Sequence, residues 1–252
     1  MTAIQRTSSE PPWVIAALVL LSFVLMTLLL ASPILIRTFL FQPFNIPAGS
    51  MAPTLLIGDF FFVSKYPYGW GSYASLFSPP LLSGRILGSQ PARGDVVAFL
   101  LPKDNSTVYI KRVVGLPGDR IQMKDGLLHI NAVPLTRERL ADFIGEDPCG
   151  TGQATATRTK RWRETLPNGV SHETLDCMDY GYYDNTIVYT VPSGHLFMLG
   201  DNRDNSTDSR VLSAVGYVPM ENLIGRAGMI YFSSRRDPTA NARAGRIGMV
   251  VR

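Results

Sequence analysis

Residues 41–55 have the sequence FQPFNIPAGSMAPTL, with Ser50 beyond its midpoint. Proline and glycine on both sides of this serine favour a turn with a restricted backbone. Apolar residues flank the hydroxyl in both directions, and the stretch starts shortly after a long apolar segment. The stretch therefore offers a hydroxyl on a constrained turn, between apolar residues and close to the end of that segment.

The apolar segment, residues 13–36, is WVIAALVLLSFVLMTLLLASPILI and carries no charged side chain. A helix needs about 20 apolar residues to cross the hydrocarbon core of a membrane. The segment is long enough to span, and it is too long for the apolar part of a cleavable signal. We expect residues 1–12 to be a short polar tail and residues 13–36 to be a transmembrane anchor.

Beyond the anchor, short apolar runs alternate with turn signals such as Pro-Gly, Asp-Gly and Pro-Ser-Gly. This alternation predicts a mainly β domain over residues 37–232. Residues 120–192 are more polar, and we expect a smaller inserted β subdomain there. Residues 233–252 are Arg-rich and weakly patterned, so the sequence does not assign them. The runs that predict strands are 60–63, 95–100, 108–114, 127–130, 186–191, 195–199 and 227–232.

The chain has 252 residues and a net charge of +4, which allows one or two domains with a modestly basic surface. No Lys/Arg run is interleaved with aromatic residues, which argues against nucleic-acid binding. The charge is either an ordinary surface excess or, as fits a membrane-anchored protein, a source of attraction to anionic lipid headgroups. Nothing in the sequence sets the oligomeric state.

Metal and cofactor sites are not indicated. Residues 200–210, GDNRDNSTDSR, look at first like a calcium loop, but Arg203 takes a ligand position and Ser206 replaces the required glycine. The two cysteines, Cys149 and Cys177, lack the Cys-x-x-Cys spacing of zinc or thioredoxin chemistry. They would be free thiols in the cytosol and could form a disulfide on an oxidising face of the membrane.

A serine nucleophile needs a neighbour that takes its proton. None of the three histidines lies in a recognisable triad setting, and no Gly-x-Ser-x-Gly motif surrounds Ser50. Lysine can act as the base if its pKa falls from about 10.4 towards 7–8, and desolvation lowers it in that direction. Residues 109–119, YIKRVVGLPGD, contain a candidate. On a strand Lys111 shares a face with Tyr109 and Val113, which would keep its ammonium group dry.

Four blocks in this order, residues 41–55, 93–99, 109–119 and 200–210, resemble the type I signal peptidases. The resemblance implies an antiparallel β-sheet catalytic core with an inserted β subdomain and an N-terminal transmembrane helix. It implies Ser50 as nucleophile and Lys111 as general base, without a cofactor. Ser206 would orient the lysine, and Asp208 and Arg210 would form a structural ion pair. The residues matching the family's substrate pockets are Phe44, Ile46, Met51, Leu55, Tyr109 and Ile110.

By the same resemblance, the substrates are the signal peptides of exported preproteins. The N-terminus would lie in the bacterial cytoplasm and the catalytic domain on the periplasmic face of the inner membrane. One position departs from many members, because Ala48 replaces a serine whose hydroxyl helps to bind the oxyanion. Two alternatives remain open: a processing peptidase dedicated to a conjugation or secretion system, and an inactive β-domain that binds peptides.

Overall fold

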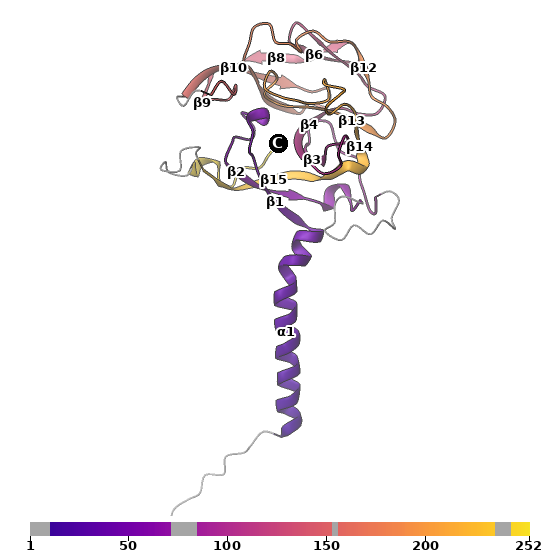
Figure 1. Ribbon diagram of the computed structural model, residues 1–252, viewed down its shortest axis with the longest axis vertical. Coiled ribbons are helices and arrows are strands. Elements are labelled where there is room, and N and C mark those ends of the chain that lie inside the picture. The colour runs from indigo at the N-terminus through magenta and orange to yellow at the C-terminus, as the bar shows by residue number, and fades with distance from the viewer. Residues whose placement is uncertain (1–10, 72–84, 153–155, 235–242) are drawn as a thin grey trace, which may run out of the picture.

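A long N-terminal helix stands apart from a β-rich body in the computed structural model (Figure 1), which describes residues 11–71, 85–152, 156–234 and 243–252. The helix α1 (Pro12–Phe39) starts with a proline in its first turn, where a backbone N–H has no helical partner to lose. Of the described helices, α1 alone is long and apolar enough to cross a membrane, and most of its side chains are exposed. It covers the predicted anchor and continues beyond residue 36. The predicted tail, residues 1–12, lies almost wholly outside the described residues.

The body is built on a seven-stranded antiparallel sheet, counted over the described residues. β3 and β4 lie near its centre, and the side chains of β3 are almost all buried. Its strands, in spatial order, are β1 (Phe41–Asn45), β2 (Asp59–Ser64), β15 (Leu223–Ser233), β3 (Val96–Leu100), β4 (Val108–Gly115), β13 (His195–Leu199) and β14 (Val218–Pro219).

Two smaller antiparallel sheets lie on the side of the body away from α1 (Figure 1). All of their strands fall within residues 120–192, where we expected the inserted subdomain. One contains β11 (Ser171–Asp176), β10 (Ala156–Thr165) and β8 (Thr136–Arg139), with β9 (Phe143–Glu146) paired to the other half of β10. The other contains β12 (Tyr189–Thr190), β5 (Arg120–Lys124), β6 (Leu127–Ile130) and β7 (Val133–Pro134). The prediction of a mainly β fold with one N-terminal apolar helix is confirmed.

The hairpin between β5 and β6 follows directly from its two turn residues. Asp125 and Gly126 have φ angles of 48° and 72°. A two-residue turn with positive φ at both positions matches the right-handed twist of the strands it joins, and Asp-Gly is one of the pairs that adopts it most readily. The Asp-Gly signal in the sequence is therefore a true hairpin turn.

The strand expected at residues 186–191 is wrong in its extent, since β12 has only Tyr189 and Thr190. Thr186 bonds to Met123 through its hydroxyl as well as its backbone: Oγ1 accepts from Met123 N at 3.0 Å, and Thr186 N donates to Met123 O at 3.1 Å. The side chain takes a hydrogen bond that a ladder partner would otherwise supply, so the chain reaches β5 in an irregular conformation. The pattern of apolar residues does not reveal that a side chain takes the place of a backbone partner.

The end of the chain, which the sequence left unassigned, packs against the large sheet. Val250 forms a bridge with Met229 of β15, and Val251 is buried. The short 3-10 helix η4 (Ala244–Arg246) presents Arg246, which donates to Thr54 O at 2.8 Å and pairs with the buried carboxylate of Asp59 at 2.5 Å. The remaining 3-10 helices are η1 (Gly49–Met51), η2 (Tyr66–Tyr68) and η3 (Met220–Asn222).

Candidate active site

Ser50 lies on η1, directly after the extended segment that continues β1 away from the membrane helix. Gly49 allows this turn to come close to the insert, the segment of residues 120–192 that carries the two smaller sheets. A Cβ at Gly49 would stand 3.3 Å from Pro148 O. Gly200 allows an even closer approach from the other side: a Cβ there would lie 2.6 Å from Ser50 O, which no real side chain tolerates. Two glycines therefore let the turn that carries Ser50 fit between the insert and the Gly200 loop.

Lys111 on β4 points at this turn, and its Nζ donates to Ser50 Oγ at 2.6 Å. The side chain is only 3% exposed, and Nζ lies 5.6 Å from the centre of the Tyr109 ring. Val113, on the same face of the strand, is fully buried. The alternation that predicted a dry environment between Tyr109 and Val113 agrees with these contacts.

The pKa of Lys111 is lowered from 10.5 to about 8, mainly because burial disfavours the charged form. The carboxylates of Asp208 and Asp201 oppose this shift by attracting the ammonium group, while the Arg210 guanidinium adds to it. A pKa near 8 leaves an appreciable fraction of Lys111 neutral at physiological pH. In that form the amine can accept the hydroxyl proton of Ser50.

The loop of residues 200–210 supplies a buried ion pair beside the lysine. Asp208 accepts from Arg210 Nε at 2.8 Å and from Arg210 Nη2 at 2.9 Å, a bidentate arrangement. Burial alone would raise the pKa of Asp208, but Arg210 and several hydrogen bonds hold it below its usual range. Ser206 Oγ donates to the same carboxylate at 2.8 Å. The direct contact between Ser206 and Lys111 that the resemblance implies is not among these bonds and stays a prediction.

Sequence reasoning missed a second buried ion pair, between Arg112 and Asp201. Arg112 is fully buried, and its Nε and Nη2 donate to the two oxygens of Asp201 at 2.7 and 2.6 Å. Thr54 Oγ1 donates to Asp201 at 2.5 Å, and Arg112 also donates to the backbone O of Arg252. These bonds tie the strand of Lys111 to the loop of Ser50. The available signals were the arginine next to Lys111 and an aspartate that looked like a calcium ligand.

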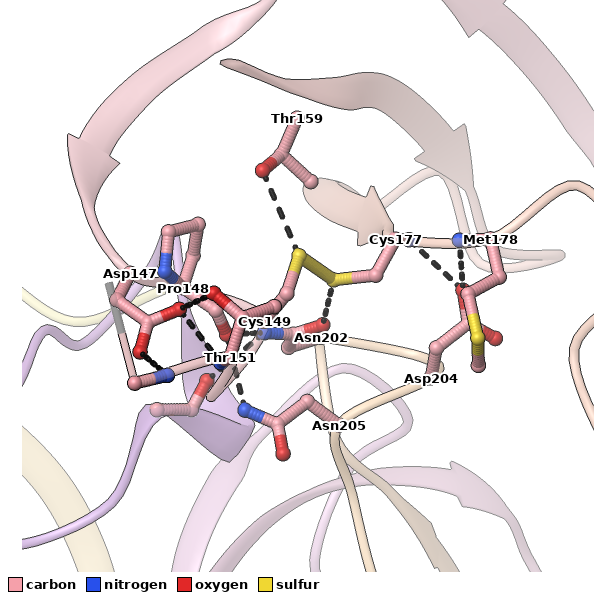
Figure 2. The surroundings of a disulfide bond; sticks show 12 residues. Asp147, Pro148, Cys149, Thr151, Thr159, Cys177, Met178, Asn202, Asp204 and Asn205 are labelled. Atoms are coloured by element: carbon pink, nitrogen blue, oxygen red, sulfur yellow. Dashed lines mark hydrogen bonds between the residues drawn. A yellow bond between two sulfur atoms is a disulfide. The ribbon is translucent and has the colours of Figure 1, made fainter. Parts of the chain in front are cut away.

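Asn202 bonds both to the turn that carries Ser50 and to the insert, and Figure 2 shows it beside Pro148 and the disulfide. Its backbone N donates to Ser50 O at 3.1 Å, and its Nδ2 donates to Gly49 O at 3.2 Å and to Pro148 O. Next to Pro148, Cys149 forms a disulfide with Cys177, and the Cα atoms are 5.8 Å apart. Cys177 Sγ lies 3.4 Å from Asn202 Oδ1. The disulfide is therefore close to the turn that carries Ser50, with Pro148 and Asn202 between them.

The residues matching the family's substrate pockets lie close together. Ile46, Met51 and Leu55 are buried in one apolar cluster, and Phe44 and Ile110 pack against it half-buried. Tyr109 contacts the neighbouring cluster around Phe99 instead.

Other catalytic arrangements have less support in the described residues. No three of their His, Cys, Asp or Glu side chains are grouped as metal ligands would be. His129 and His195 bond through Nδ1 to backbone carbonyl oxygens two residues away. His172 is buried beside Glu164, and burial lowers its pKa well below the usual value. Ser50 and Lys111 therefore remain the candidate catalytic pair.

The chain is similar to known proteins over most of its length. Residues 16–232 match the family described as signal peptidase, peptidase S26. The chain is 40% identical over 221 residues to signal peptidase I of Rickettsia typhi, which covers 84% of this chain and 80% of that protein. It is 42% identical over 210 residues to the enzyme of Rickettsia conorii, covering 80% and 75%. A crystal structure of signal peptidase I from Enterococcus faecalis is 24% identical, covers 55% of this chain and 97% of that one, and has a TM-score of 0.31.

Proposed function

Because this chain belongs to the signal peptidase family, peptidase S26, we propose that Ser50 and Lys111 are the nucleophile and the general base of its reaction. The chain is a serine peptidase whose substrates are preproteins with signal peptides. The observation that carries the assignment of roles is the 2.6 Å hydrogen bond between Lys111 Nζ and Ser50 Oγ, made by a lysine with a pKa of about 8.

In the proposed reaction, neutral Lys111 takes the proton from Ser50 as Oγ attacks the scissile carbonyl carbon. The resulting ammonium then gives this proton to the leaving amine when the peptide bond breaks, so the lysine is neutral again. The signal peptide is left as an ester on Ser50. A water molecule, deprotonated by the same lysine, hydrolyses this ester and restores the free hydroxyl.

The substrate would bind as an extended strand before the scissile bond. Phe44 and Ile110, which pack half-buried against the cluster of Ile46, Met51 and Leu55, would line its approach to Ser50. Small side chains at the first and third positions before the cut fit between such close apolar walls, whereas large ones would displace them. This arrangement supports the specificity that the resemblance implies.

We also propose the location of the enzyme. α1 supports a single anchor in a membrane, and the disulfide supports an oxidising compartment for the body. Both fit the inner membrane of a bacterium with the active site on the periplasmic face. The net charge of +4 would favour contact with anionic headgroups next to the anchor.

Cleavage of a preprotein in detergent tests the function and the nucleophile together. We expect the wild type and the control Ser193→Ala, at an exposed serine, to release the mature protein with the new N-terminus after a small residue. Ser50→Ala should leave the preprotein intact. Mass spectrometry of the products identifies the cleaved bond. Full activity in Ser50→Ala would refute the nucleophile, and an inactive wild type would favour a peptide-binding domain.

A further inference from the structure

A cavity of about 260 Å³ lies between the nucleophile turn and the insert. Gly49 and Ala52, which flank Ser50, form one wall, and Phe143 and Ile144 of β9 form the opposite wall. Ser50, Lys111 and the residues matching the substrate pockets do not line it. The cavity therefore borders the turn that carries Ser50 and is separate from the residues proposed to bind the substrate before the scissile bond.

The direction of the chain places this cavity after the cut. β1 follows the end of α1, and the purple 3-10 helix η1 (Gly49–Met51) lies farther from α1, beside β9 and below β10 (Figure 1). A signal peptide has its apolar part in the membrane, so it approaches from the side of α1, where Phe44 and Ile46 precede Ser50. The residues that follow the scissile bond must leave on the other side, towards β9.

We infer that the cavity binds a side chain among the first residues of the mature protein, those that follow the scissile bond. This inference rests on the proposed function. An extended chain advances about 3.3 Å per residue. Since Gly49 and Ala52, which lie before and after Ser50 in the chain, border the cavity, roughly the first three residues after the cut can reach it.

The walls select for an apolar, uncharged side chain. Leu56 and Ile57 add to the apolar lining, and Arg243 and Glu146 close the cavity with an ion pair at 3.7 Å. Arg243 also donates to Ile57 O at 3.0 Å. Because these charges already have partners, a charged substrate residue would lose hydration without gaining a matched partner.

A peptide series tests the inference. Each peptide has alanine at the first and third positions before the cut, and Leu, Ala, Lys or Glu at one of the first three positions after it. At one of these positions the wild type should cut the Leu peptide about tenfold faster, in kcat/KM, than the Lys or Glu peptide. The ratio between two peptides is measured with the same enzyme, so partial misfolding of a variant cancels.

Ile144 is 62% exposed, so a charged residue there should not disturb folding. Ile144→Lys should raise the ratio of Glu-peptide to Lys-peptide cleavage about threefold, and Ile144→Glu should lower it by a similar factor. Ile187→Lys, at an exposed isoleucine of the insert away from the cavity, should keep the wild-type ratio. If peptides are cut but the ratios in both Ile144 variants equal that of the control, the inference is overturned alone. If no peptide is cut, the proposed function falls and the inference with it.

Discussion

Lys111 Nζ lies 2.6 Å from Ser50 Oγ, although 61 positions separate the two residues in the chain. If Lys111 is the general base, it must be able to lose its proton, and a substitution of this residue can test that requirement. Lys111→Arg retains the positive charge and the reach, but a guanidinium stays protonated at any accessible pH. We expect kcat/KM for a preprotein to fall at least about a hundredfold. Lys124→Arg, at an exposed lysine of β5, should change it little. An active Lys111→Arg enzyme would show that another group takes the proton.

Removal of the disulfide should lower the stability of the protein and leave its catalysis almost unchanged. Cys149 and Cys177 are 28 positions apart, and closing a loop of this size stabilises the fold by about 3–4 kcal/mol in the chain-entropy model. For a body of this size, Cys149→Ala/Cys177→Ala should lower Tm by roughly 10 °C. Its kcat/KM at 25 °C should stay within about threefold of the wild type, since neither sulfur touches the reacting atoms.

Thiol labelling checks the bond itself. The denatured, unreduced wild type should have no reactive thiol, because both cysteines are bonded to each other. Two labelled thiols under these conditions would refute the disulfide and remove its support for an oxidising compartment.

The C-terminal segment should support the Ser50 loop through Arg246. This arginine bonds to Thr54 O and pairs with Asp59, whose carboxylate is fully buried and also accepts from Leu56 N at 2.8 Å. Arg246→Ala leaves this carboxylate short of a partner, which should cost about 2 kcal/mol of unfolding free energy. Urea denaturation measures the loss, with Arg120→Ala as a control at an exposed arginine. Equal unfolding free energies in the two variants would contradict the role of Arg246.

Ala48 offers a gain-of-function test. Its backbone is extended, with φ −133° and ψ 151°, and its side chain is exposed, so a serine fits there without strain. A hydroxyl at this position would be a second donor to the oxyanion beside the backbone N–H of Ser50. Losing one such donor typically costs 10²–10³ in kcat. We expect Ala48→Ser to raise kcat at least about tenfold with KM little changed, because the oxyanion exists only after the ground state. An unchanged kcat would mean that another group already fills this role.

Local patterns in the sequence predicted those parts of the structure that depend on neighbouring residues. The length of the apolar run predicted α1, the Asp-Gly pair marked the β5–β6 turn, and strand alternation placed Lys111 with Tyr109 and Val113. The proximity of Ser50 and Lys111 came from the resemblance, since nothing in either motif refers to the other.

Contacts between distant segments could not be predicted in the same way. Alternation correctly separated Arg112 from Lys111, but Arg112 is buried because Asp201, 89 positions later, neutralises it. Likewise, Arg246 meets Asp59 across 187 positions, in a segment without a hydrophobic period. The strand β10 was missed because its many charged residues pair with charges on neighbouring strands, as Arg163 does with Glu138. Buried ion pairs and charged strands could not be predicted from local patterns, because their charged partners come together only in the folded chain.

The dependence of kcat/KM on pH is the most direct measurement of the claim that neutral Lys111 activates Ser50. Below its pKa the lysine is protonated and cannot accept a proton, so the rate should rise with pH and level off once the amine is neutral. Burial lowers this pKa to about 8, and the half-maximal rate should therefore fall near pH 8. A midpoint near 10, the value of a solvated lysine, or near 6.5, that of a histidine, would contradict the account.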